Sequence, residues 1–411
     1  MTLFPKVDIG IRDSTGADAF GRLRVSQPLT IFDSKQIFDN QPMFWDEELE
    51  SGAGITAAHS VNTASTVITS TVDTAGLFTR QTFMRFNYQP GKSMLIYMTA
   101  TLDRSGGGTG TQRRLGYFDD NNGLFFEDDA GTIKVVRRTK VTGSVVDNKV
   151  AQTSWNHDVM DGTGPSGITV DWTKAQIFFI DFEWLSVGRV RMGLKIHGQI
   201  YLVHEFLNAN VLATAYMSTP NLPVRFQVET QATSAASTIE CICSSIMSEG
   251  GMQDLGVLRY KSTEGTHVDM ATENIIYAIV GIRLKVTHLG ATISIVDVTI
   301  AEHVGSKDFE WILIFNPTVA DTFTYGAETN SAIETALGVT ANTVTGGTIF
   351  AGGFASSAQK GGVTSSSEIE NALRLGADIS DNVDEIVLCA RPVGGSTNID
   401  VEGSISWREV P

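Results

Sequence analysis

The clearest hydrophobic pattern in the chain lies in residues 176–206, where three apolar runs are separated by the short breaks LSVG and HGQ. The middle run alternates apolar and basic residues, which is the period of two that a half-buried strand requires. Its apolar set is Val190, Met192, Leu194 and Ile196, and its basic set is Arg189, Arg191, Lys195 and His197. The first run carries bulky residues on both faces, as a central strand does. We predict an antiparallel meander whose middle strand turns its even-numbered side toward the core.

Similar patterns extend over most of the chain. Asn122-Gly123 stands between two aromatic runs, which predicts a hairpin with a left-handed two-residue turn. The region from residue 257 onward alternates again, and only Ser331–Leu337 and Ser366–Leu375 have a spacing that predicts short helices. The chain has 40 glycines and no regular alternation of strands with helices, which argues against a parallel, doubly wound sheet. We therefore predict an all-β fold of two antiparallel, jelly-roll-like β-sandwich domains, with two short helices in the C-terminal half.

The length of the chain adds a domain division. A chain of 411 residues exceeds the roughly 250–300 residues at which one hydrophobic core stops growing, so two domains are expected. Glycines and polar residues at 251–256 predict a linker between a first, lectin-like jelly roll at 46–250 and a second sandwich at 257–411. Residues 1–45 show no sustained period and predict an extended arm. The arm residues expected to contact a neighbouring surface are Phe20, Arg22, Leu23, Arg24 and Phe32.

Charge and composition exclude several classes of partner. Thirty basic against 46 acidic residues give a formal charge of −16, which would repel a nucleic-acid backbone. The longest apolar runs, Gln176–Leu185 and Asn274–Leu284, are shorter than the ~20 residues of a membrane-spanning helix. The first residues do not resemble a secretory signal, so synthesis and assembly in a cytoplasm are expected. Cys241 and Cys243 suit buried positions on a strand rather than a disulfide or a metal site. No cofactor and no metal are predicted.

Two acids in the meander raise the question of catalysis. Asp181 and Glu183 are two residues apart on a strand and project together, as the acid and the nucleophile of a retaining glycosidase must. The next strand, however, would place Arg191 opposite Asp181 and Arg189 opposite Glu183. Such ion pairs keep both acids ionised and remove the proton donor that hydrolysis needs. We therefore predict structural ion pairs and no catalytic residue, with a glycoside hydrolase as the third hypothesis.

A loop and two tryptophans suggest a different ligand. His157 and Asp158 lie in a polar loop, and Trp155 and Trp172 flank it. Aromatic rings stack on sugar rings, and polar loop residues bind hydroxyl groups, so these four residues form a possible glycan-binding site. Packing of the tryptophans in the core of the sandwich is the alternative reading of the same residues.

Several sequence blocks resemble one known family. They include DAFGRLRVSQPLTIFDSK at Asp18–Lys35, QRRLGYFDDNNGLFFE, the meander, and FEWILIFNPTVADTFTYG in the second half. These blocks are similar to a family of structural (virion) proteins of tailed bacteriophages, especially those of aquatic bacteria. The resemblance spans nearly the whole chain and implies location in a virion; the family has no assigned reaction.

Two main functional hypotheses follow from the resemblance. The first is a structural component on the capsid or tail surface, of the decoration, spike or fibre type. It would assemble through its arm into a homo-oligomer, expected to be a trimer, beside other virion proteins. The alternative is an adsorption module of the virion that binds host-surface polysaccharide. Neither hypothesis includes an enzyme, nucleic acid or a membrane span.

Overall fold

The computed structural model describes residues 17–22, 28–104, 108–251, 255–304, 307–355 and 374–410. The strand pairings within these ranges are antiparallel, for example those of β6 (Ser93–Thr101), β11 (Gln176–Phe182) and β12 (Val190–Ile196). Helix in the same ranges is limited to two three-residue 3₁₀ turns, η1 (Gln152–Ser154) and η2 (Val286–His288). None of the helices described is long and apolar enough to cross a membrane. The prediction of an all-β fold built from antiparallel sheets is confirmed.

One of the two predicted helices lies wholly within the described residues, and the structure does not form it. Ser331–Leu337 contains strand β23 (Ile333–Leu337), so that helix prediction is wrong. The strand pairs with β18 (Tyr277–Leu284), and its side chains at Ile333 and Ala336 are buried in the sheet. A short apolar run can satisfy either period, and here the long-range pairing decides. Most of the second predicted helix, Ser366–Leu375, lies outside the described residues.

The chain forms two compact units, which we describe separately. Unit 1 comprises Met1–Gln81 and Tyr88–Met252, and unit 2 comprises Thr82–Asn87 and Gln253–Pro411. The second boundary falls inside the segment predicted as a linker. The first was not predicted: the segment Thr82–Asn87, which begins at the last residue of β5 (Gly76–Thr82), belongs with unit 2, where the Ala377 backbone N–H donates to the carbonyl of Phe83 at 3.1 Å.

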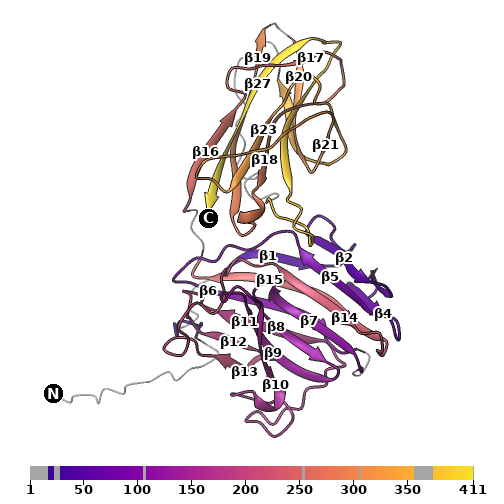
Figure 1. Cartoon of the computed structure of the whole chain (residues 1–411), viewed down its shortest axis with the longest axis vertical. Helices are drawn as coiled ribbons and strands as arrows, with labels where there is room; N and C mark the ends of the chain where they lie inside the picture. Colours follow the sequence, from indigo (N-terminus) through magenta and orange to yellow (C-terminus); the bar gives the residue numbers. More distant parts are fainter. Residues whose placement is uncertain are drawn as a thin grey trace, which may run out of the picture. The chain divides into compact units, whose positions relative to one another are not determined.

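Unit 1 contains two large sheets (Figure 1). The first has the order β13-β12-β11-β6-β15-β4-β3, with β1 paired to β15. Its strands are β13 (Gln199–Phe206), β12 (Val190–Ile196), β11 (Gln176–Phe182), β6 (Ser93–Thr101), β15 (Ser237–Glu249), β4 (Ser65–Ser70), β3 (Ile55–Ser60) and β1 (Leu29–Lys35). The second has the order β10-β9-β8-β7-β14-β5-β2. Its strands are β10 (Val146–Ala151), β9 (Thr132–Thr139), β8 (Gly123–Asp129), β7 (Thr111–Phe118), β14 (Val224–Thr230), β5 (Gly76–Thr82) and β2 (Trp45–Gly52).

Aromatic side chains join these two sheets into a sandwich. Phe126 of β8 meets Phe178 of β11 with ring centroids 5.0 Å apart, and Tyr117 of β7 meets Phe182 of β11 at 5.6 Å. Phe178 and Phe182 are even-numbered residues of β11. The buried apolar residues of β12 are also even-numbered and lie on the same face of the sheet. The predicted orientation of the meander toward the core is therefore confirmed, and the odd-numbered residues of β11 and β12 lie on the opposite face of the sheet.

The hairpin at Asn122-Gly123 exists, but its turn differs from the prediction. Strands β7 and β8 are joined by residues 119–122, and Gly123 already pairs with Phe118. The Asp119 carboxylate accepts hydrogen bonds from the backbone N–H groups of Asn121 and Asn122, both at 2.8 Å. An aspartate side chain that caps its own turn in this way takes the place of the two-residue Asn-Gly turn.

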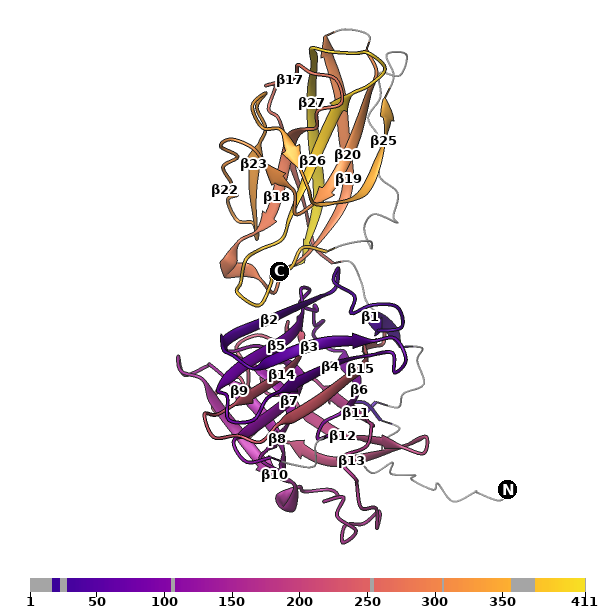
Figure 2. The same ribbon diagram turned by 90° about the vertical axis from the view of Figure 1, so that its right-hand side faces the viewer.

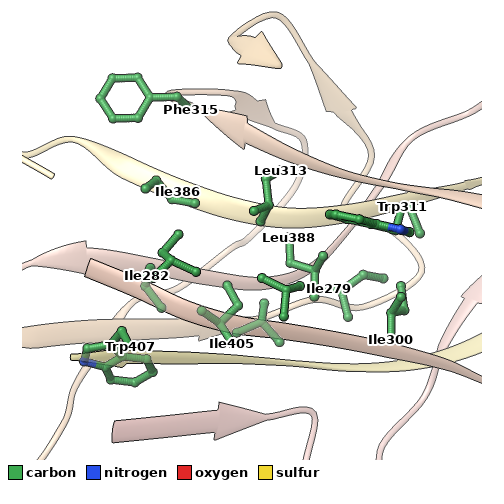
Figure 3. Close-up of a cluster of buried hydrophobic side chains, with 14 of the residues drawn as sticks. Ile279, Ile282, Ile300, Trp311, Leu313, Phe315, Ile386, Leu388, Ile405 and Trp407 are labelled. Atoms are coloured by element: carbon green, nitrogen blue, oxygen red, sulfur yellow. The ribbon is translucent and has the colours of Figure 1, made fainter. Parts of the chain in front are cut away.

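Unit 2 is a second sandwich with one main core. One sheet joins β16 (Val257–Ser262), β27 (Ile399–Val410), β17 (Val268–Met270) and β19 (Thr292–Val304). The other has the order β22 (Gly326–Ala327), β23, β18, β26 (Glu385–Pro392), β20 (Phe309–Phe315) and β25 (Thr348–Ala355). A short pair, β21 (Thr318–Val319) with β24 (Val344–Thr345), is separate from both. Figure 3 shows Ile300, Ile405 and Trp407 of the first sheet packed against Ile282, Leu313 and Leu388 of the second.

Candidate functional site

The meander positions the charged residues that the sequence singled out. Strand β11 pairs with β12 so that Asp181 lies opposite Arg191, as predicted. The backbone continues this pairing one step further, because the Glu183 N–H donates to the Arg189 carbonyl at 3.0 Å. The Glu183 carboxylate in turn accepts from the Arg189 backbone N–H at 3.0 Å. All four side chains therefore come from adjacent positions on one face of the sheet.

Asp181 and Arg191 form a buried ion pair. The two side chains are almost completely removed from solvent, and Nη1 of Arg191 lies 3.5 Å from Oδ2 of Asp181. Ser93 on the neighbouring strand β6 donates its hydroxyl to Oδ1 of the same aspartate at 2.7 Å. A carboxylate so enclosed cannot reach a sugar ring or a water nucleophile. Both partners are needed, because removal of either side chain would leave the other charge buried without compensation and would destabilise the sheet.

Residues Ala17–Arg22, which we call the anchor, form a closed turn of their own. The Asp18 N–H donates to the Arg22 carbonyl at 2.8 Å, and the Gly21 N–H donates to the Asp18 carbonyl at 2.9 Å. Oδ1 of Asp18 accepts from the backbone N–H groups of Phe20 and Arg22, and Oδ2 pairs with the Arg22 guanidinium at 2.8 Å. Gly21 has φ +77°, a left-handed conformation that glycine adopts without strain. The aspartate thus fixes the shape of the anchor.

The anchor lies on the arginine side of the meander. Nη1 of Arg191 donates to the Ala17 carbonyl. Arg189 donates from Nε to the Ala19 carbonyl and from Nη2 to the Asp18 carbonyl, both at 3.1 Å. Three successive backbone carbonyls are therefore held by two arginines, and Ala17, Asp18 and Ala19 are each at most 4% exposed. Arg22 adds a hydrogen bond to the Gly91 carbonyl at 2.8 Å.

A hollow of about 430 Å³ lies where the anchor meets the meander. It is lined by Phe20 of the anchor, by Glu183, Val187 and Arg189 of the meander, and by Leu207 and Asn208 after β13. Burial raises the pKa of Glu183, and the charges of Asp18 and Asp181 raise it further, while Arg189 opposes them. The arginine expected opposite Glu183 therefore does not lower the pKa of this acid below its usual value, because desolvation outweighs the effect of Arg189.

The predicted arm residues have different positions. Phe20 and Arg22 belong to the anchor, and the Arg22 guanidinium lies 4.9 Å from the centroid of the Phe20 ring. Leu23 and Arg24 lie outside the described residues. Phe32 is not an arm residue: it lies in β1, buried against the rings of Phe44 and Trp45, each 6.2 Å away. The arm prediction thus extended too far, because Leu29–Lys35 pairs with β15 as part of unit 1.

The four candidate glycan-binding residues do not form an exposed platform. Trp155 is buried; its indole donates to the Val150 carbonyl at 3.2 Å, and its ring packs edge-on to Trp172 at 6.3 Å. Trp172 is half-buried and stacks on Phe178 at 6.4 Å. Their large apolar surfaces are used in packing, so the prediction that both tryptophans are available to a sugar is wrong.

The two polar candidates also have structural partners. Asp158 is buried, and its carboxylate accepts hydrogen bonds from the backbone N–H groups of Met160 and Ser166, which shape the loop. His157 is exposed, and its Nε2 lies 3.2 Å from Glu205. Glu205 is also 3.9 Å from Nη1 of Arg189, so His157 is linked to the arginine that holds the anchor.

Other reactive groups of the described chain do not assemble into a site. Within the described ranges, no group of three histidine, cysteine, aspartate or glutamate side chains could hold a metal ion. Cys241 and Cys389 are buried and Cys243 is half-buried, and burial raises the pKa of all three thiols. A bulge in β15 lies between Cys241 and Cys243, so the simple alternation expected for this pair is interrupted there.

Comparison with known proteins gives similar structures and no related sequence. No protein-family model matches the chain, and no curated protein matches it. The carbohydrate recognition domain of Emp47p matches 54% of this chain and 97% of its own, at 10% identity and a TM-score of 0.34. A lectin from Bauhinia forficata in complex with GalNAc matches 54% of this chain and 98% of its own, at 10% identity and a TM-score of 0.33. The family GH16 endo-β-1,3(4)-glucanase SCLam matches 55% of this chain and 92% of its own, at 12% identity and a TM-score of 0.35.

Sequence reasoning missed the residues that anchor the arm. Ala17, Asp18 and Ala19 have no hydrophobic period, and two of them bind through backbone carbonyls alone. A signal was nevertheless present in DAFGR, where an aspartate precedes a glycine by three residues and an arginine by four. Aspartate and glycine in this order are typical of a turn closed by its own side chain.

Proposed function

We propose that the chain is a non-catalytic structural subunit of a tailed-phage particle, attached in part through its N-terminal arm. The resemblance of its sequence blocks to virion proteins supports the location. The docking of the anchor supports the mode of attachment, and it is the observation on which the proposal rests. Arg191, which is buried, and Arg189, which is half-buried, hold the backbone of this irregular segment, so the anchor has a fixed place on unit 1.

The same contacts support a structural role over hydrolysis. Asp181 is enclosed by Arg191 and Ser93, and the anchor lies over both arginines. A retaining glycosidase needs two carboxyl groups that are open to the same substrate. Glu183 faces the hollow, but its strand neighbour is inaccessible. The acids of the meander thus support the sheet and the anchor, and we assign them no reaction.

The experiment uses purified particles and two matched variants. Residues 1–27 are deleted, so that β1, which begins at Leu29, is retained. The second variant is Asp33→Ala, an exposed change in β1 that leaves the anchor intact. We expect the tagged wild-type protein and Asp33→Ala to appear on particles by electron microscopy, and the deletion variant to be depleted although it folds. Absence of the wild-type protein from mature particles would reject the proposal.

Normal incorporation of the deletion variant would reject the role of the arm alone. Circular dichroism of each purified variant establishes that the compared proteins are folded. The number of tagged copies around each position on the particle also gives the symmetry of the assembly, including whether it is the trimer expected from the sequence.

A further inference from the structure

Strand β25 forms one edge of the six-stranded sheet of unit 2 and combines an uncharged sequence with large exposed apolar side chains. Among the described strands it pairs only with β20, and Figure 2 shows it at the margin of the sheet. Its sequence, TIFAGGFA, contains no charged residue. Edge strands are normally protected by charges, as β2, β10 and β16 are here. An uncharged edge with exposed apolar residues is suited to pairing with another strand.

Two side chains make this edge unusually apolar. Phe354 is 73% exposed and Ile349 is 60% exposed. Both lie on the face opposite the main core, because they pair with Glu310 and Ile314 of β20, which share that face. Gly352 pairs with Ile312 and therefore lies on the same face, between the two apolar side chains. The edge thus presents an exposed ring beside a position without a side chain.

The β25 edge of one copy is complementary to the β25 edge of a second copy. A bulge near Ile349 interrupts the pairing with β20, but Ala351–Ala355 alternates regularly. If two copies meet antiparallel about a two-fold axis at Gly353, Ala351 of each lies opposite Ala355 of the other. Phe354 of each then lies opposite Gly352 of the other, on the same face. An aromatic ring over a cross-strand glycine covers backbone that glycine leaves exposed.

The matching register of Phe354 and Gly352 favours a second copy of this chain as the occupant, and the uncharged edge is the part of the surface where charge opposes such pairing least. The chain carries a formal charge of −16, so most faces of two copies repel each other. The β25 edge adds no charge of its own to that repulsion, and a second copy supplies the matching strand. We propose that β25 pairs with β25 of a second copy and forms a two-fold dimer. Such a contact closes on itself, so a trimer would require other surfaces.

The first test is the association state of the full-length protein. Sedimentation equilibrium should show a wild-type dimer, and Phe354→Lys should weaken dimerisation at least about 100-fold, or tenfold for each of the two symmetry-related rings. The matched control is Tyr260→Lys, a similarly exposed aromatic on the edge strand β16, which should leave the dimer unchanged. Added salt should not weaken the dimer, because it screens the repulsion between acidic chains.

The second test determines the register. The double variant Ala351→Cys/Ala355→Cys should form a disulfide-linked dimer on oxidation, because the two positions face each other across the proposed axis. They are too far apart on one strand to join within a chain, at about 13 Å. Ala351→Cys alone should form little crosslinked dimer, because residue 351 of one copy lies opposite residue 355 of the other copy and not opposite residue 351.

Three outcomes would overturn the proposal. One is a wild-type protein that is monomeric at all measurable concentrations. Another is a dimer that Phe354→Lys and Tyr260→Lys affect equally or not at all. The third is a monomer that dimerises only after residues 356–373 are replaced by a glycine-serine linker, because the chain itself would then occupy this edge.

Discussion

Arg191 binds two oxygen atoms from distant parts of the chain, the Asp181 carboxylate at 3.5 Å and the backbone carbonyl of Ala17. The same guanidinium therefore neutralises a buried charge of the meander and holds the N-terminal anchor. Loss of this side chain should affect both the stability of unit 1 and the position of the arm.

Arg191→Met should lower the free energy of unfolding by about 3–5 kcal/mol, because it leaves Asp181 buried without its counter-charge. Urea denaturation followed by tryptophan fluorescence measures the change. Lys195→Met, on the same strand and the same side but half-buried, is the control and should change stability by less than about 1 kcal/mol. The double variant Asp181→Leu/Arg191→Met should recover much of the loss; a double variant no more stable than Arg191→Met would contradict the ion-pair explanation.

Asp18→Ala should release the anchor without unfolding unit 1. The change removes two hydrogen bonds to backbone N–H groups and the pair with Arg22. Trypsin should then cleave after Arg22 several-fold faster, since proteolysis requires a locally opened chain. Asp33→Ala serves as the control because its carboxylate is exposed on β1. Equal cleavage rates in Asp18→Ala and the wild-type protein would show that the aspartate does not hold the anchor.

His204 should make stability depend on mildly acidic pH. Burial lowers its pKa from 6.5 to about 4, with a smaller contribution from His157. Its Nδ1 accepts a hydrogen bond from the Asn156 backbone N–H at 3.3 Å, which the neutral ring permits. A depressed folded-state pKa means that this contribution is present above pH 6.5 and is lost as the pH falls toward 4.

The melting temperature of His204→Gln should therefore fall less between pH 7 and pH 4 than that of the wild-type protein. Differential scanning calorimetry at several pH values measures the difference. NMR titration of the wild-type imidazole provides an independent check, and an apparent pKa near 6.5 would contradict the prediction.

Gly123→Ala should be strongly destabilising. A Cβ at this position would lie 2.0 Å from Cβ of Phe118, and the residue has φ +149°. Gly143→Ala is a matched control, since Gly143 also has a positive φ, of +87°, but open space around it. We expect Gly123→Ala to lower the free energy of unfolding by at least about 2 kcal/mol more than Gly143→Ala. Chemical denaturation measures both; similar losses would show that backbone strain alone matters.

The parts of the fold that the sequence predicted are those set by local alternation. The meander, the face of β12 that is buried and the pairing of Asp181 with Arg191 all follow from residues close together along the chain. The helix predicted at Ser331–Leu337 failed because seven residues are too few to establish a period, and pairing with β18 determines the conformation of Ile333–Leu337.

The candidate site was less predictable for a related reason. Its essential contacts join Ala17 and Ala19 to residues more than 160 positions away, through backbone carbonyls that every residue possesses. Such bonds cannot be predicted from the identity of the side chains at Ala17 and Ala19. The two tryptophans led to the opposite error: Trp155 and Trp172 are residue types common in sugar-binding surfaces, but here Trp155 packs against Trp172, and Trp172 packs against Phe178.

Because Arg189 and Arg191 bind the anchor through its backbone carbonyls, a free peptide can compete with the anchor for them. Arg189 and Arg191 bind the carbonyls of Ala17, Asp18 and Ala19, so a short free peptide with the sequence of Ala17–Arg22 contains all the groups that they bind. Because Asp18 preorganises the turn, such a peptide would lose little conformational entropy on binding. Because the attached segment competes at a high effective concentration, we expect displacement only in a large excess of the peptide, which would then detach the anchor from intact protein.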